Sequence, residues 1–180
     1  MRSISWLVLA TAIFGGLQFA ASAAVQPPQK TAPVAVVKAM YAWYFAQPGS
    51  AAGVHDWWKN LSETKALFDP VLFGLLATAS DLRVIDVDPF TNSQSGALAY
   101  RIGTPSTKGV ATIVPVAIQD CLSCDKPANP SRARAALKAD VRKQSDGSYV
   151  IYNLLYDGFD LRSWLSKAIA KCRADPKNCP

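Results

Sequence analysis

One segment of the chain, residues 132–143, alternates apolar and charged side chains almost without exception, as RARAALKADVRK. Because successive side chains of a β-strand point to opposite faces, this period of two predicts a strand with one buried and one solvated face. Strands of that kind belong to antiparallel sheets that are covered on one side. Ala136 departs from the alternation.

Three further segments carry strand signals: residues 97–102, 109–120 and 149–156. The second of them has apolar or β-branched side chains at every other position, namely Val110, Thr112, Val114, Val116 and Ile118. Turn-forming residues at 145–148, SDGS, precede the last strand and are typical of a hairpin. Together with residues 132–143, these ranges predict an antiparallel meander.

The chain before residue 80 has a helical period instead. Pro33 suits the first turn of a helix over residues 34–46, which is apolar on nearly every face and therefore needs cover on nearly every face. Ser62 can cap a short helix that ends near residue 68. Asp69 can cap another, which ends near residue 79.

A closing helix is predicted after the last strand, with Asp160 as its cap. Its inward side chains are expected to be Leu161, Trp164, Leu165, Ala168 and Ile169. Helices followed by a meander indicate an α+β fold, in which N-terminal helices pack on a curled antiparallel sheet and a C-terminal helix follows.

Residues 1–23 have the character of a secretory signal peptide, with Arg2, an apolar run over residues 4–19 and small residues at the Ala23 cleavage position. The apolar run is shorter than the roughly 20 residues that a membrane-spanning helix needs. We therefore expect cleavage near Ala23, a periplasmic or secreted protein, and no stable membrane anchor.

The remaining sequence divides into a flexible lead-in, residues 24–32, and a single α+β domain, residues 33–180. Without Arg2 the 18 Lys and Arg outnumber the 13 Asp and Glu, which leaves a net charge of +5. Basic patches can bind nucleic acid, but an exported protein meets little of it. The basic side chains are therefore interpreted as a solvated face, with no nucleic-acid partner.

Four cysteines fall in the exported part, and an even count in an oxidising compartment favours disulfides. The short loops between them predict the pairs Cys121–Cys124 and Cys172–Cys179. A redox role for the CxxC pair is disfavoured, because a loop and not a helix follows it. Zinc is disfavoured because a second close CxxC is absent. We expect no metal and no cofactor.

The stretch DVDPFTNSQ, residues 86–94, concentrates polar groups. A calcium loop is excluded by spacing, since Pro89 interrupts the alternating acids and no Glu follows. Two interpretations remain: a turn that begins at Asp88-Pro89 with Phe90 anchored inward, which is favoured, and an acid–base site that uses Asp86 and Asp88. His55, the lone histidine, is a further catalytic candidate.

Several short motifs resemble a bacterial family, domain of unknown function 3828. They are DPF at residues 88–90 with Gln94, Tyr100-Arg101, VPV at residues 114–116, and YVIYNLLYDGFDLRSWL at residues 149–165. The resemblance implies a cystatin-like fold of the nuclear transport factor 2-like kind, in which helices pack into a curled antiparallel sheet that forms a cone. It implies no catalytic residues. The late motif is also similar to the end of periplasmic phospholipid-shuttle proteins.

These observations favour a non-catalytic binding or accessory module of the bacterial envelope, whose partner is a small molecule or an envelope protein. A small hydrolase or isomerase with an acidic or histidine site, and a periplasmic lipid carrier, are the alternatives. If the core is not filled, a ligand pocket is expected where large aromatic side chains meet a strand of small ones. Its residues would be Tyr41, Trp43, Tyr44 and Ala135.

Overall fold

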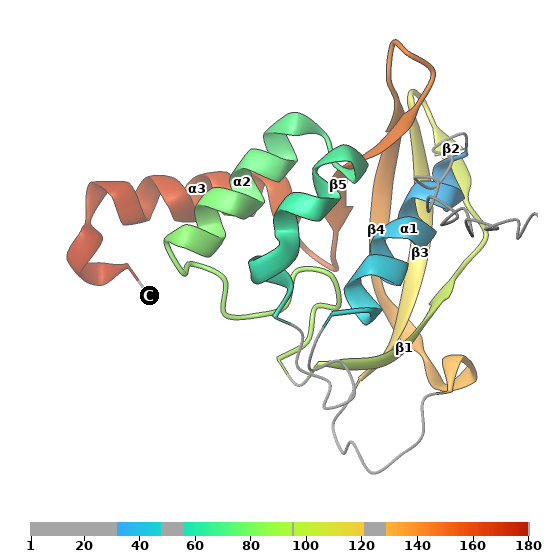
Figure 1. Cartoon of the computed structure of the whole chain (residues 1–180), viewed down its shortest axis with the longest axis horizontal. Helices are drawn as coiled ribbons and strands as arrows, with labels where there is room; N and C mark the ends of the chain where they lie inside the picture. Colours follow the sequence, from blue (N-terminus) through green and yellow to red (C-terminus); the bar gives the residue numbers. More distant parts are fainter. Residues whose placement is uncertain (1–31, 48–55, 95, 121–128, 180) are drawn as a thin grey trace, which may run out of the picture.

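The computed structural model describes residues 32–47, 56–94, 96–120 and 129–179. Within them a five-stranded antiparallel sheet follows three helical segments and precedes a C-terminal helix (Figure 1). The α+β class expected from the change of period is confirmed. The segments 1–23 and 24–31 of the expected signal peptide and lead-in lie outside the described residues.

The strands are β1 (Ala97–Ile102), β2 (Ser106–Lys108), β3 (Ala111–Asp120), β4 (Arg134–Lys143) and β5 (Tyr149–Leu155). Their order is β1-β3-β4-β5, and the short β2 pairs with the start of β3. The sheet is open, so the cone implied by the family resemblance stays a prediction. Strand β2 was not predicted, because its three residues are all exposed and carry no apolar alternation.

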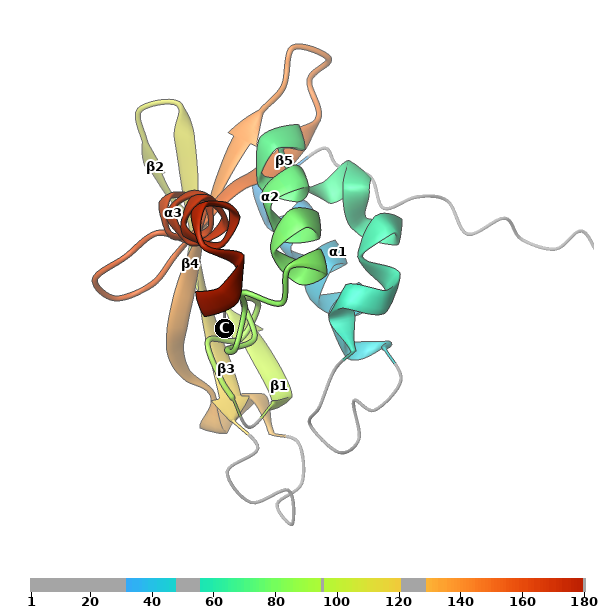
Figure 2. The same cartoon turned by 90° about the vertical axis from the view of Figure 1, so that its left-hand side faces the viewer.

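The first helix, α1 (Pro33–Phe45), is followed by the 3₁₀ segment η2 (Trp57–Leu67) and by α2 (Pro70–Asp81). Figure 2 shows all three on one side of the sheet. The Asp69 side chain accepts hydrogen bonds from the Val71 and Leu72 amides and so caps α2, as predicted. The short helix expected from Ser62 is instead a 3₁₀ segment that begins earlier, at Trp57.

Part of the core lies between α1 and the inner face of the sheet, and the rest includes buried residues of η2, α2 and α3. In α1, Tyr41 and Tyr44 are fully buried, and the Tyr41 ring stacks on Tyr100 of β1 with 4.8 Å between ring centroids. Phe90, also fully buried, packs edge-on against Tyr44 at 5.8 Å. Aromatic rings from one helix, one strand and one loop therefore fill the space where the sequence left open either a pocket or a packed core.

The C-terminal helix α3 (Leu161–Ala174) packs against α2 and is followed by the short 3₁₀ segment η4 (Pro176–Asn178). Asp160 caps α3 by accepting a hydrogen bond from the Ser163 amide, as predicted. The expectation that Trp164 faces inward is wrong. Trp164 is 36 % exposed, and its side chain faces residues of the loop before β1 across a cavity.

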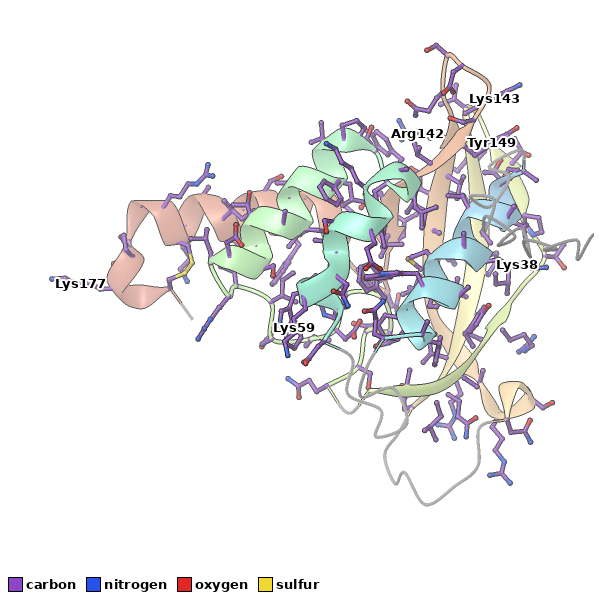
Figure 3. The ribbon with its side chains drawn as sticks, viewed as in Figure 1. Lys38, Lys59, Arg142, Lys143, Tyr149 and Lys177 are labelled. Atoms are coloured by element: carbon purple, nitrogen blue, oxygen red, sulfur yellow. A yellow bond between two sulfur atoms is a disulfide. The ribbon has the colours of Figure 1, made fainter. Side chains whose placement is uncertain are left out.

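A disulfide joins Cys172 to Cys179, which confirms that predicted pair (Figure 3). It ties the tail to α3, and Cys179 Sγ lies 3.6 Å from the Leu82 carbonyl oxygen at the end of α2. The other predicted pair, Cys121–Cys124, lies outside the described residues. In the ranges that the structure covers, every helix is too short or too polar to cross a bilayer.

Basic side chains are spread over the molecule, except that the guanidinium groups of Arg142 and Arg162 both lie over the Tyr152 ring, 3.3 and 4.0 Å from its centroid. Figure 3 shows Lys59, Lys143 and Lys177 on well-separated parts of the surface. Arg142 is paired with Asp140 at 3.1 Å. Lys59, Lys143 and Lys177 are exposed, as expected for a solvated face, whereas Arg142 is half-buried and its partner Asp140 is buried.

Candidate functional site

The loop between α2 and β1 closes on itself at residues 88–93. The Asp88 amide donates to the Ser93 carbonyl at 3.1 Å, and the Asn92 amide donates to the Asp88 carbonyl at 2.8 Å. The Asp88 side chain accepts from the Phe90 amide at 2.8 Å, which is the local hydrogen bond that favours aspartate at the start of a turn. Asn92 has a positive φ of 54°, which asparagine tolerates well. The turn interpretation of this stretch is confirmed.

The same loop is anchored to α1 by two tyrosine hydroxyls. Tyr41 donates to the Phe90 carbonyl and Tyr44 donates to the Asp88 carboxylate, both at 2.6 Å. Phe90 is enclosed by the rings around it, so the loop is held by apolar packing as well. Its conformation is therefore set by helix α1 as much as by its own sequence.

Partial burial of Asp88 raises the pKa of its carboxyl group to about 6, because water is excluded from the charged form. The hydrogen bonds from Tyr44 and from the Phe90 amide lower the same pKa but do not cancel the effect of burial. Burial, with a smaller contribution from the Asp88 charge, raises the pKa of Tyr44 and of Tyr156 far above the ordinary value. Both phenols stay protonated and act as donors.

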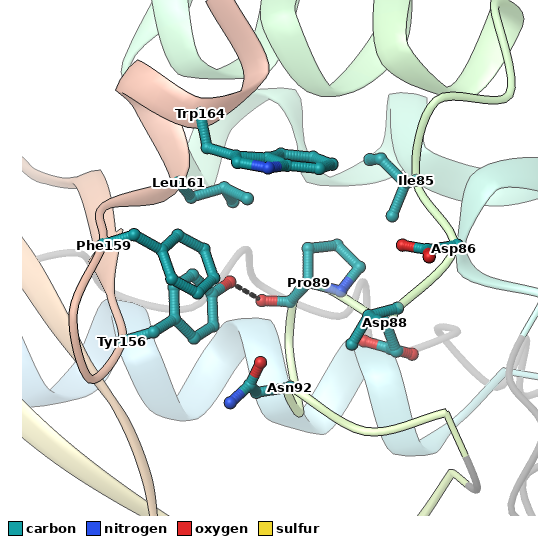
Figure 4. A pocket seen from close by; sticks show the side chains of 10 residues that line it. Ile85, Asp86, Asp88, Pro89, Asn92, Tyr156, Phe159, Leu161 and Trp164 are labelled. Atoms are coloured by element: carbon teal, nitrogen blue, oxygen red, sulfur yellow. Dashed lines mark hydrogen bonds between the residues drawn. The ribbon is translucent and has the colours of Figure 1, made fainter. Parts of the chain in front are cut away.

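A cavity of about 250 Å³ lies between this loop and the junction of β5 with α3 (Figure 4). One wall comes from the loop and consists of Ile85, Asp86, Val87, Asp88, Pro89 and Asn92. The opposite wall comes from the end of β5 and the first turns of α3 and consists of Tyr156, Phe159, Leu161 and Trp164. Figure 4 shows the Asp86 carboxylate on the side opposite the rings of Phe159 and Tyr156, with the Trp164 indole lying across the cavity.

The two walls are joined by a hydrogen bond from the Tyr156 hydroxyl to the Pro89 carbonyl oxygen. The Tyr156 ring stacks on Phe159 with 4.5 Å between centroids. A turn holds this pair, in which the Tyr156 amide donates to the Phe159 carbonyl at 2.9 Å and Gly158 has a φ of +85°. That φ favours glycine, so the turn that holds the stacked pair depends on Gly158. The two walls of the cavity are therefore fixed to each other by a hydrogen bond and by ring packing.

The structure brings two of the catalytic candidates together, because Asp86 and Asp88 both line the cavity. The two carboxylates differ in exposure and in hydrogen bonding. The Asp86 side chain is exposed, whereas both Asp88 oxygens already accept hydrogen bonds, one from Phe90 and one from Tyr44. The third candidate, His55, lies outside the described residues.

The ligand pocket expected at Tyr41, Trp43 and Tyr44 is a packed part of the core. Tyr41 and Tyr44 are fully buried, and Trp43 is half-buried against Phe90, with its indole nitrogen donating to Glu63 at 3.2 Å. None of the three lines the cavity at Asp86. Ala135 is a residue of β4 and pairs with Ala117; its side chain lies outside what the structure describes.

Sequence reasoning missed the aromatic wall. The sequence pattern assigned no role to Phe159, and it placed Trp164 on the inward face of the closing helix, whereas both side chains line the cavity. The available signal was composition: YDGFD, residues 156–160, places two aromatic rings around a glycine turn immediately before a helix. A ring exposed at such a position marks a surface and not a core.

A second cavity, of about 620 Å³, opens on the far side of Ile85. Its other lining residues come from η2 and from the end of α2, and they are Trp57, Trp58, Ala79, Ser80, Asp81 and Arg83.

Among the residues described, no three of the His, Cys, Asp and Glu side chains lie close enough to hold a metal ion. The cavity at Asp86 has the composition of a small-molecule site, which is mostly apolar with a few polar groups.

Comparison of the chain with protein-family models, with curated proteins and with solved structures gives no match. The resemblance to domain of unknown function 3828 therefore stays a prediction.

Proposed function

We propose that this protein is an exported, non-catalytic binding module of the bacterial envelope that holds a small molecule in the cavity between Asp86 and Trp164. The observation that carries the proposal is the exposure of two large aromatic side chains at one preformed cavity. Phe159 is 44 % exposed and Trp164 is 36 % exposed, and both line it. Clustered exposed rings of this kind are typical of a binding surface.

The arrangement of the carboxylates supports binding over catalysis. Asp88 has its two oxygens engaged by the Phe90 amide and the Tyr44 hydroxyl, and these contacts maintain the loop. Asp86 is then the carboxylate left to meet a ligand. A general acid–base mechanism needs two groups that can exchange protons with the reacting atoms.

The ligand-observed NMR signal of an aromatic fragment library would test the proposal. We expect some fragments to show a saturation-transfer signal with the unsubstituted protein and no such signal with the Trp164→Ala variant. The matched control is Trp58→Ala, since Trp58 is 46 % exposed and lines the other cavity. Fragments that bind all three proteins equally, or that bind none of them, would contradict a site at Trp164.

A small hydrolase or isomerase is the second candidate, and one observation favours it. Asp86 and Asp88 line the same cavity, and a carboxyl pKa of about 6 lies in the range that acid–base catalysts use. Turnover of an ester or ketone panel that is lost in the Asp88→Asn variant, in a folded protein, would establish the enzyme in place of the binding module.

The lipid carrier receives no support from this cavity. Its volume is about 250 Å³, which suits a small ligand, whereas the acyl chains of a phospholipid need a much larger apolar cavity. Lipid that copurifies with the protein and is identified by mass spectrometry would restore this alternative.

A further inference from the structure

We propose that the cavity between Asp86 and Trp164 selects small organic cations, and quaternary ammonium compounds above all. This inference rests on the proposed binding function and names the class of ligand. It follows from three features of the same site: the sign of its charge, the kind of rings that line it, and the small number of its hydrogen-bonding groups.

The charge of the site is negative although the whole chain carries +6. Two carboxylates, those of Asp86 and Asp88, are among its ten lining residues, and the other eight include no Lys, Arg or His. Figure 4 shows the Asp86 carboxylate directed toward the space between Trp164 and Pro89. A cation placed there gains from both carboxylates, whereas a phosphate or carboxylate ligand is repelled.

The rings suit a cation as well. Trp164 presents an indole, the side chain with the strongest cation–π attraction, and Figure 4 shows it lying over the cavity opposite Pro89. Phe159 and Tyr156 add a stacked pair on the adjoining side. Aromatic rings together with a carboxylate are the groups by which proteins recognise quaternary ammonium ions.

The scarcity of hydrogen-bonding groups distinguishes a quaternary ammonium from other polar ligands. Besides the two carboxylates, the hydrogen-bonding side chains of the lining are those of Asn92, Tyr156 and Trp164. Trp164 offers a single indole N–H donor, and the Tyr156 hydroxyl is already bonded to Pro89. A sugar would leave most of its hydroxyls without partners, which is costly in a partly enclosed site. A trimethylammonium group has no N–H to satisfy, and a cavity of about 250 Å³ accommodates it.

Titration calorimetry with a charged and an uncharged ligand of the same shape separates the contribution of the ligand's charge from that of its apolar shape. The probes are choline and its neutral isostere 3,3-dimethylbutan-1-ol, added to the protein at pH 7.5 and low salt. We expect choline to bind about tenfold more tightly than the alcohol, which corresponds to one favourable cation–π and carboxylate contribution. Added salt should weaken choline binding and leave the alcohol unaffected.

Two substitutions assign the selectivity to the site. Asp86→Asn is expected to remove about tenfold of the choline affinity and to leave the affinity for the alcohol unchanged. Asp157→Asn is the matched control, because Asp157 is an exposed carboxylate next to Tyr156 that does not line the cavity. Asp157→Asn changes the net charge by the same amount as Asp86→Asn and should leave the affinities for choline and for the alcohol unchanged.

The outcomes distinguish this inference from the function on which it rests. Choline and the alcohol could bind with equal affinity, and Trp164→Ala could abolish the binding of both. This result would overturn the cation selectivity and support the binding function. An equal loss of choline affinity in the Asp86 and Asp157 variants would also overturn it, since the attraction would then come from net charge. Absence of binding by both probes and by the fragment library would refute the two proposals together.

Discussion

Replacing Asp88 by asparagine should change how the stability of this protein depends on pH. The carboxyl group has a pKa of about 6 in the folded protein, against an ordinary value of 3.8, because burial disfavours its charged form. This difference corresponds to about 3 kcal/mol of folding free energy. We treat that figure as an upper limit, since the Asp88 side chain is partly and not fully buried.

The sign follows from which state binds the proton. Between about pH 4 and pH 6 the folded protein holds a proton on Asp88 that the unfolded chain has released. The contribution of Asp88 to stability is therefore fully present below pH 4 and is lost as the pH rises through 6. Asparagine is uncharged at every pH, and its side-chain carbonyl still accepts from the Phe90 amide, so the variant lacks this dependence.

Urea unfolding at several pH values from 4 to 7.5, followed by tryptophan fluorescence, measures the effect. We expect the free energy of unfolding of Asp88→Asn, minus that of the unsubstituted protein, to rise by up to about 3 kcal/mol across this range. Asp86→Asn is the control in the same loop, because it removes one exposed carboxylate and leaves Asp88 and its hydrogen bonds in place. This variant keeps Asp88 and should therefore keep the pH dependence that Asp88 contributes.

Parallel stability profiles for Asp88→Asn and the unsubstituted protein would refute the reasoning. That result would mean that water reaches the Asp88 carboxylate in spite of the rings around it. A difference that falls as the pH rises would show instead that the hydrogen bonds from Tyr44 and Phe90 outweigh burial.

Three further substitutions test the anchoring of the site. Tyr44→Phe removes a hydrogen bond to a charged group and should cost about 1.5–3 kcal/mol at pH 7 and less at pH 4, as measured by urea unfolding at the two pH values. Phe90→Ala empties a fully buried ring site and should cost about 3–5 kcal/mol, with the thermal midpoint as the readout; a loss below 1 kcal/mol would show that the loop is not anchored there. The double variant Cys172→Ala/Cys179→Ala opens a disulfide loop with a sequence separation of 7 and should cost about 2–3 kcal/mol in urea without reductant; an unchanged midpoint would contradict a stabilising role.

Much of the fold could be predicted from the sequence because it depends on local periodicity and on caps. The alternation in residues 132–143 identified β4, and the apolar run after Pro33 identified α1. Asp69 and Asp160 located the starts of α2 and α3, since a capping side chain bonds to amides two or three residues away. The Cys172–Cys179 pair followed from the short loop between its members. Each of these features is decided within a few residues of chain.

The site was decided by contacts between residues far apart in the sequence. The sequence alone identified residues 86–94 as a polar turn. It did not show that Tyr156, 67 residues after Pro89, donates a hydrogen bond to the Pro89 carbonyl and forms part of the opposite wall of the cavity. It also assigned Trp164 to the core. The period of a helix predicts which face is apolar, but not which element packs against that face. Whether an apolar ring is buried or lines a cavity depends on what packs against it, and only the tertiary structure places the Asp86 loop across from α3.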